Sequence, residues 1–156
     1  MKKHPDAGFT LPELLGVMVI VGILSLGALY SWQRWQQQQQ LRASVQQLQG
    51  FLLRLRAHAN WHNHDLGLWV IPGGSGCLGV GSKPPYGCAL PSRWWFRPPH
   101  NGVRLTGLTG EPGFYGRRDV ARPGSITLES EAGQWRLIIS ARGRIRACPS
   151  GEKGCE

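Results

Sequence analysis

The stretch Gly8-Phe9-Thr10-Leu11-Pro12-Glu13 opens the segment that decides the fold of this chain of 156 residues. An apolar run follows it, with no charged residue from Leu14 to Ser31. As a helix rising about 1.5 Å per residue, residues 9–32 would span about 36 Å, enough to cross a hydrocarbon core of about 30 Å. We therefore expect a transmembrane helix here. A carboxylate at the edge of hydrocarbon is costly without a partner, so Glu13 needs a specific task.

The residues ahead of this segment form a short polar leader, 1–8, with two lysines. Positive charge beside a membrane span favours the cytoplasmic side, which would place the rest of the chain outside the cytoplasm. The apolar run is longer than the core of an ordinary secretory signal, and no small-residue cleavage site follows it. We expect the run to be retained as a single-pass anchor.

These residues resemble the class III leader of type IV pilins and type II secretion pseudopilins. The resemblance implies that a prepilin peptidase cuts between Gly8 and Phe9 and that Phe9 is then methylated. It also implies that Glu13, at the fifth mature position, pairs with the N-terminal amine of a neighbouring subunit in a filament. Such a pair attracts more strongly in a low dielectric than in water. The alternative is a plain membrane anchor whose Glu13 reaches the headgroups.

The positions of the prolines refine this resemblance. Pro12 fits the first turn of a helix, where its missing N–H costs little. No proline then follows until Pro72. Many major pilins have a helix-kinking proline near the position of Tyr30, so its absence favours a minor pilin or a pseudopilin.

An apolar stripe continues the helical rhythm beyond Gln33. Its members recur at steps of four and three residues: Leu41, Val45, Leu48, Leu52, Leu55 and Ala59. We predict that residues 33–60 form the amphipathic half of one long helix and bury this stripe against a sheet. A coiled coil with a partner helix is the alternative.

The remainder, residues 61–156, consists of short apolar or alternating runs separated by glycine and proline, which is typical of β-structure. The expected strands are 66–71, 93–96, 103–106, 125–130, 134–140 and 144–148. The last three form an expected antiparallel meander whose residues resemble the C-terminal half of the GspH/FimT group of minor pilins and pseudopilins. The expected fold class is therefore α+β: a pilin-like fold with a long N-terminal helix packed on an antiparallel β head.

The four cysteines, Cys77, Cys88, Cys148 and Cys155, all follow the expected anchor and would lie in an oxidising compartment. Disulfides are the usual state there. Four cysteines allow three connectivities, and we favour Cys77 with Cys88 and Cys148 with Cys155, because each pair joins the ends of a Gly/Pro-rich loop. The sequence has no close C-x-x-C pair, so the cysteine spacing does not indicate a zinc site.

We find no signature of an enzyme in the sequence: no nucleophile elbow, phosphate loop or paired carboxylates are present. His58 and His62 are four residues apart, and His64 is nearby, but no third type of ligand accompanies them in a motif. We therefore expect no metal and no cofactor. The seven tryptophans could stack on bases or sugars, but those in the expected strands, Trp69, Trp94, Trp95 and Trp135, more often pack in the protein.

Charge supplies the last clue, since the chain has 18 lysines and arginines against 9 acidic residues. Arg142, Arg144 and Arg146 occupy alternate positions and would project together from one strand face. In the FimT branch the pattern Gly143-Arg144-Ile145-Arg146 is associated with DNA capture, which would make double-stranded DNA a partner. Contacts with other subunits are the alternative role for these arginines.

The resemblance implies a minor pilin that enters a type IV pilus near its tip, with other pilin or pseudopilin subunits as partners. It would first reside in the inner membrane with a periplasmic head. A DNA-binding minor pilin for natural transformation and a type II secretion pseudopilin are the alternatives.

Overall fold

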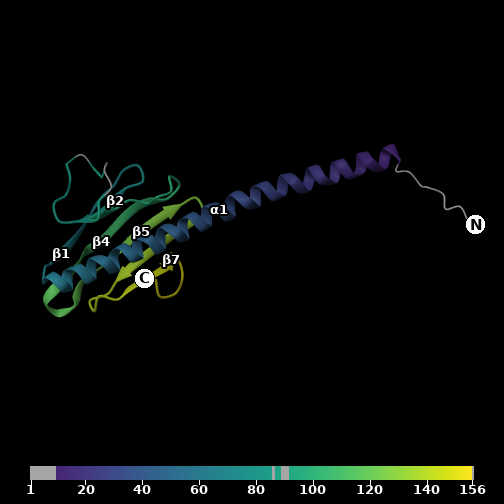
Figure 1. Cartoon of the computed structure of the whole chain (residues 1–156). Helices are drawn as coiled ribbons and strands as arrows, with labels where there is room; N and C mark the ends of the chain where they lie inside the picture. Colours follow the sequence, from purple (N-terminus) through teal and green to yellow (C-terminus); the bar gives the residue numbers. More distant parts are fainter. Residues whose placement is uncertain (1–9, 86, 89–91, 156) are drawn as a thin grey trace, which may run out of the picture. The chain divides into compact units, whose positions relative to one another are not determined.

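One long helix precedes all of the β-structure in this chain (Figure 1). The computed structural model describes residues 10–85, 87–88 and 92–155. Helix α1 (Leu11–His62) is followed by seven strands and one 3-10 turn, η1 (Gly116–Arg118). The chain divides into two compact units, Met1–Gln36 and Gln37–Glu156.

The first turn of α1 is capped by residues of the sequence motif itself. The Thr10 carbonyl accepts the N–H groups of Glu13 at 3.1 Å and Leu14 at 3.2 Å. The Glu13 carboxylate reaches back, and its Oε2 atom accepts the Thr10 N–H at a long 3.5 Å. The contact from Glu13 is the glutamate half of a capping box, the pattern that Thr-x-x-Glu favours at a helix start. Pro12 is tolerated because N–H groups of the first turn have no intrahelical partner.

Among the described side chains of the first unit, the large apolar ones are exposed, including Leu15, Ile20 and Leu24. In the described residues, no helix combines the length and the apolar character needed to cross a membrane. The transmembrane helix expected over residues 9–32 is therefore not confirmed.

In the second unit the apolar stripe of α1 forms one side of the core. All six predicted stripe residues are buried, and Phe51 joins them. They pack against sheet residues such as Phe114, Ile126 and Leu137. The prediction that the stripe is buried against a sheet is confirmed, and the coiled-coil alternative is not needed to cover it.

The sheet has seven strands in the order β3-β2-β1-β4-β5-β6-β7. Every pairing between neighbours is antiparallel. The strands are β1 (Leu66–Ile71), β2 (Cys77–Val80), β3 (Trp95–Phe96), β4 (Arg104–Tyr115), β5 (Val120–Ser130), β6 (Gly133–Ile139) and β7 (Ile145–Pro149). The predicted strand at 66–71 and the C-terminal meander are confirmed.

The hairpin of β4 and β5 is much longer than the predicted strands at 103–106 and 125–130. Its outer half contains glycines and a proline, which regular strands disfavour, and the hairpin accommodates them through register shifts between Leu105 and Gly107 and between Gly110 and Gly113. Strand β2 was missed because its four residues are too few to show a period. The predicted strand at 93–96 shortens to β3, which leaves Trp94 in a turn.

Two disulfides link the pairs that the sequence favoured. Cys77 at the start of β2 bonds to Cys88, with their Cα atoms 6.3 Å apart. Cys148 on β7 bonds to Cys155, with a Cα separation of 6.0 Å. Two arginines of the meander hold this second loop, because Arg136 donates to the Cys155 carbonyl at 3.1 Å and Arg146 to that of Gly154 at 3.2 Å.

Candidate functional site

The processing site proposed from the sequence, Gly8 and Phe9, lies outside the described residues. The predicted assembly residue, Glu13, is described, and it is exposed. Its carboxylate uses one oxygen in the capping box with Thr10. The sequence pattern Thr-x-x-Glu could have revealed this local contact, which the interpretation of Glu13 as an assembly residue passed over.

The turn between β6 and β7 presents the arginines singled out in the sequence. Gly143 has a positive φ of 71°, a conformation that favours glycine. Ser140 closes this turn through hydrogen bonds. Its carbonyl accepts the Gly143 N–H at 2.8 Å, and its hydroxyl accepts the Arg144 N–H at 3.2 Å. The Ser140 N–H in turn donates to the Arg144 carbonyl at 3.0 Å. The backbone that carries Arg142 and Arg144 is therefore well fixed.

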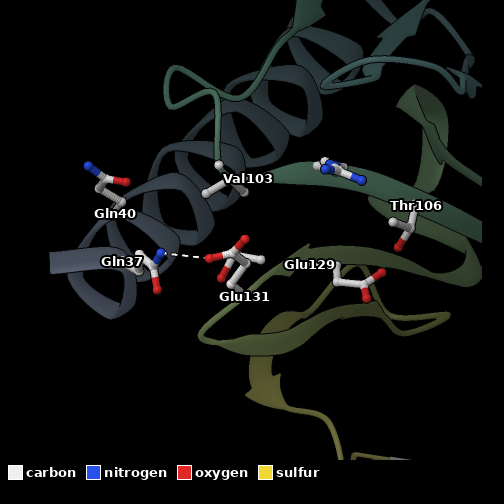
Figure 2. Close-up of a pocket in the computed structure, with 9 residues that line it drawn as sticks. Gln37, Gln40, Val103, Thr106, Glu129 and Glu131 are labelled. Carbon is white, nitrogen blue, oxygen red and sulfur yellow. Dashed lines mark hydrogen bonds between the residues drawn. The ribbon is translucent and has the colours of Figure 1, made fainter. Parts of the chain in front are cut away.

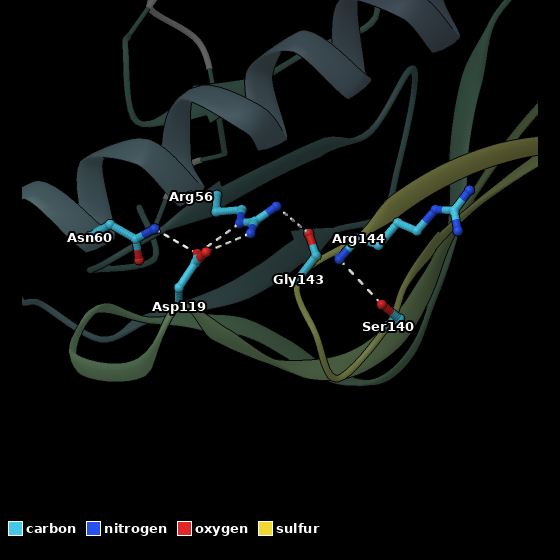
Figure 3. A network of polar contacts seen from close by, with 6 residues as sticks. All are labelled: Arg56, Asn60, Asp119, Ser140, Gly143 and Arg144. Atoms are coloured by element: carbon cyan, nitrogen blue, oxygen red, sulfur yellow. Dashed lines mark hydrogen bonds and ion pairs between the residues drawn. The ribbon is translucent and has the colours of Figure 1, made fainter.

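A side chain from α1 ties this turn to a second one (Figure 3). Arg56 donates through Nη1 to the Gly143 carbonyl at 3.0 Å. It also donates through Nε and Nη2 to the two carboxylate oxygens of Asp119, at 2.9 and 2.8 Å. Asn60, one helical turn further on, donates to Asp119 at 2.6 Å. We call Arg56, Asn60, Asp119 and Gly143 the Arg56 clamp.

The clamp also accounts for the shifted pKa values of Asp119 and Arg56 and for the glycine at position 143. The hydrogen bonds from Arg56 and then Asn60 hold the pKa of Asp119 below its usual value, and the bond to Asp119 raises the pKa of Arg56. A Cβ atom at position 143 would lie 3.0 Å from the Arg56 Nε atom. Glycine is thus favoured there both by its φ angle and by the close approach of the guanidinium.

The three arginines do not form the single strand-face set that their spacing predicted. All three are exposed, but Arg142 lies in the turn and Arg144 precedes β7, so only Arg146 is on the strand. The guanidinium of Arg146 binds the Gly154 carbonyl. Figure 3 shows the Arg144 side chain extending away from Arg56 and Asp119. Within the described residues the guanidinium groups of Arg142 and Arg144 have no hydrogen-bond partner.

The nearby arginines differ in how much charge they can offer to a ligand. Arg122 pairs with Glu111 at 2.9 Å and donates to the Tyr115 hydroxyl at 2.9 Å. Its guanidinium also lies 5.7 Å from the centroid of the Tyr115 ring. Its charge is thus partly compensated. Arg117, in η1, is exposed.

A polar pocket of about 410 Å³ lies closer to the N-terminus of α1 than the Arg56 clamp does (Figure 2). It is lined by Gln37 and Gln40 of α1 and by residues of β4 and β5, among them Glu129. Gln37 donates to Glu131 at 2.8 Å. Gln37 and Gln40 belong to the run of five glutamines at residues 36–40, and nothing in that sequence indicates that two of its members face this pocket. Along α1, Gln37 and Arg56 are about 28 Å apart.

The histidines do not gather with other ligands in the part of the chain that the structure describes, where no three His, Cys, Asp or Glu side chains are grouped for a metal. The His58 and His62 rings stack on each other at 4.1 Å. Trp94 meets His58 edge to face, with the ring centroids 4.9 Å apart. These side chains therefore belong to an aromatic cluster.

Comparison with known proteins identifies the fold. Residues 3–29 match the family model of the prokaryotic N-terminal methylation motif. The chain is similar to the minor pseudopilin EpsH from the type 2 secretion system of Vibrio cholerae, with a TM-score of 0.53 and 16% identity over 72% of this chain and 99% of that one. This is a pilin-like chain with a prepilin methylation motif, as in minor pilins and pseudopilins. The pilin-like fold class inferred from the sequence is confirmed.

A second likeness of this pilin-like chain is to the type IV minor pilin FimU of Pseudomonas aeruginosa. Its TM-score is 0.54 at 16% identity, over 78% of this chain and 99% of that chain. Another crystal form of FimU gives a TM-score of 0.50 at 17% identity. No curated protein matches the sequence significantly. At these identities the likeness establishes the fold.

Proposed function

We propose that this chain is a minor pilin, a structural subunit that enters a type IV pilus after a prepilin peptidase has removed residues 1–8. The observation that carries the proposal is the methylation motif over residues 3–29, followed by a head of pilin-like fold. Before assembly the chain is held in the inner membrane by residues 9–32, with its head in the periplasm. After assembly it is part of a pilus on the cell surface.

The role of Glu13 follows from its charge and position. Cleavage after Gly8 leaves the α-amine of Phe9 four residues ahead of this carboxylate. In its own helix Glu13 uses Oε2 to accept the Thr10 N–H. The remaining oxygen can accept the charged amine of a neighbouring subunit, and a low dielectric strengthens such a pair.

The proline pattern, which lacks the kink near Tyr30 that many major pilins have, supports a minor subunit. We place this subunit in the initiating complex near the pilus tip. A subunit of this kind is needed in few copies and primes the filament.

Processing is the step to test first. The chain is co-expressed with a prepilin peptidase, and its intact mass is measured. Loss of residues 1–8 together with one added methyl group on Phe9 is expected. A Gly8→Val variant serves as the control that should keep its leader. Retention of the leader in the unmodified chain, with an active peptidase present, would overturn the proposal.

Double-stranded DNA capture is a second candidate, favoured by the two exposed guanidinium groups on the clamped Gly143 turn. A well-fixed backbone presents Arg142 and Arg144 without a further cost of ordering the main chain, and arginine binds phosphate through a planar fork. Such contacts carry no sequence preference, and their strength falls with salt. A titration with duplex DNA at two salt concentrations tests this candidate.

A subunit of a type II secretion pseudopilus is the third candidate, favoured by the likeness to EpsH. Deletion of the gene separates it from the first. Loss of surface pili with normal protein secretion supports the minor pilin, and the reverse result supports the pseudopilin.

A further inference from the structure

A second hollow of the head lies between α1 and the segment that leads into β3. It has a volume of about 350 Å³. Its most buried members are Phe51, Leu55 and Phe96, with exposed fractions of 3, 3 and 9%. Trp94 and His58 are half-buried, while Arg54 and Arg93 are exposed. We call this hollow the Trp94 groove, an apolar floor between two cations.

The rings of the groove are already packed against one another. The Phe51 and Phe96 centroids are 6.0 Å apart. Trp94 meets His58 nearly at right angles, at 78°, and His58 stacks on His62. The His58 Nδ1 atom is buried and has no hydrogen-bond partner in the described residues. Because the His58 ring is already engaged by Trp94 and His62, the groove suits an inserted apolar side chain better than a flat base that must stack.

The charge of the groove is of one sign. None of the described residues that line it carries a carboxylate. Within the described part of the chain, neither Arg54 nor Arg93 takes part in an ion pair. Both guanidinium groups are therefore available to carboxylates, and such charge complementarity gives a surface its choice of partner.

An exposed aromatic side chain extends this surface. Trp61 has 85% of its surface exposed. It lies three residues after His58 and seven after Arg54, so the three occupy one face of α1. Tryptophan and arginine are the residues that most often concentrate binding energy at protein interfaces. An exposed tryptophan beside a basic apolar groove thus indicates a protein partner.

We propose that the Trp94 groove docks an acidic segment of a neighbouring filament subunit. An aromatic or long aliphatic side chain of that segment enters between Phe51 and Trp94, and carboxylates on either side of it pair with Arg54 and Arg93. The inference rests on the proposed function only in placing the partner in the same filament. The chemistry of the groove itself does not depend on processing of the leader.

The test uses the full chain in nanodiscs of zwitterionic lipid, labelled with 5-fluorotryptophan and observed by fluorine NMR. The probe is the capped peptide Asp-Glu-Phe-Glu-Asp. Trp61→Phe, Trp94→Phe and Trp135→Phe variants assign the resonances of these three tryptophans. We expect saturable shifts at Trp61 and Trp94 but none at Trp135, which lies on β6. A peptide with alanine in place of phenylalanine, and one with lysines in place of its acids, should bind at least about fivefold more weakly.

Two matched double variants sharpen the result. Arg54→Gln with Arg93→Gln should weaken the peptide about fivefold, as expected for two partly exposed charge pairs. Arg42→Gln with Arg117→Gln removes the same charge from exposed positions elsewhere and should change nothing. The proposal is overturned if no saturable shift occurs, if both double variants weaken binding equally, or if an oligothymidine shifts the two resonances and the peptide does not. Peptide binding by a chain that keeps its leader after co-expression with an active prepilin peptidase would overturn the proposed function alone.

Discussion

Arg56 on α1 and Gly143 in the β6–β7 turn contact each other through a 3.0 Å hydrogen bond from Nη1 to the Gly143 carbonyl. The same guanidinium donates hydrogen bonds to both carboxylate oxygens of Asp119, the residue that follows η1. One helical side chain thus fixes two turns that are far apart in the sequence. The position of the arginine-bearing turn on the head therefore depends on α1.

Gly143→Ala tests how tightly this contact constrains the turn. The substitution forces alanine to a φ of 71° and brings its Cβ to 3.0 Å from the Arg56 Nε atom. We expect a loss of about 2 kcal/mol in the free energy of unfolding, measured by urea titration. Gly151→Ala is the matched control, because Gly151 also has a positive φ, 96°, but open space around it.

The difference between the two variants isolates the contact with Arg56. In a Gly143→Ala, Arg56→Ala double variant the total loss should be smaller than the sum of the two single losses, because the contact with the guanidinium is removed only once. Equal losses for Gly143→Ala and Gly151→Ala would mean that the contact does not constrain the turn.

The sequence predicts those parts of the fold whose pattern lies within one continuous segment. The stripe from Leu41 to Ala59 and the strand at 66–71 have clear periods, and both were found. The Arg56 clamp joins residues from three distant segments, and Arg56 by itself resembles any surface cation on a helix. The hairpin of β4 and β5 was truncated in the prediction because its glycines and prolines, which serve bulges, cannot be told from those of turns.

Asp119 makes the stability of the head depend on pH. The hydrogen bonds from Arg56 and Asn60 hold the pKa of this carboxyl below its unfolded value. The charged form is therefore favoured in the folded chain, and the resulting stability is present above the unfolded pKa and is lost as pH falls through the folded pKa. The unfolded pKa is about 3.9.

Asp119→Asn should remove this contribution while keeping a side chain that tolerates the left-handed conformation, φ 48°. The difference in Tm between the parent and the variant should be largest at neutral pH and shrink below about pH 4. A difference that stays constant down to pH 2 would show that the ionised carboxylate is not the stabilising form.

The two disulfides should each stabilise the head mainly by restricting the unfolded chain. They close loops with sequence separations of 11 and 7 residues. By loop entropy each is worth about 2 to 3 kcal/mol, measured as the free energy of unfolding of paired Cys→Ser variants. Loss of Cys148–Cys155 should also release the carbonyls held by Arg136 and Arg146 and deprotect the amides of β7 in hydrogen exchange. Equal β7 protection in both paired variants would contradict this link.

Duplex DNA binding should depend on the arginines of the turn and less on the one in the strand. The full chain is titrated by fluorescence anisotropy at several salt concentrations. Arg142→Gln with Arg144→Gln should lower the slope of log K against log salt by up to about 2, because each lost phosphate contact removes about 0.9. Arg146→Gln should change the slope less, since its guanidinium binds the Gly154 carbonyl.

Arg42→Gln with Arg104→Gln is the matched control, because both residues are exposed and lie outside the turn. A slope that falls as much in this control as in the turn variant would mean that only net charge is sensed. The DNA-capture candidate would then lose its site.

Glu13 has two separable roles, and two substitutions distinguish them. Glutamine at the third helical position still completes a capping box with Thr10, whereas alanine does not. If the charge pairs with the α-amine of a neighbouring subunit, both Glu13→Gln and Glu13→Ala should fail to enter the filament. Immunoblots of sheared pili and of membranes measure the fraction assembled. A Glu13→Gln chain that assembles as well as the parent would show that the carboxylate acts only as a helix cap, and pairing with the amine would have to be abandoned.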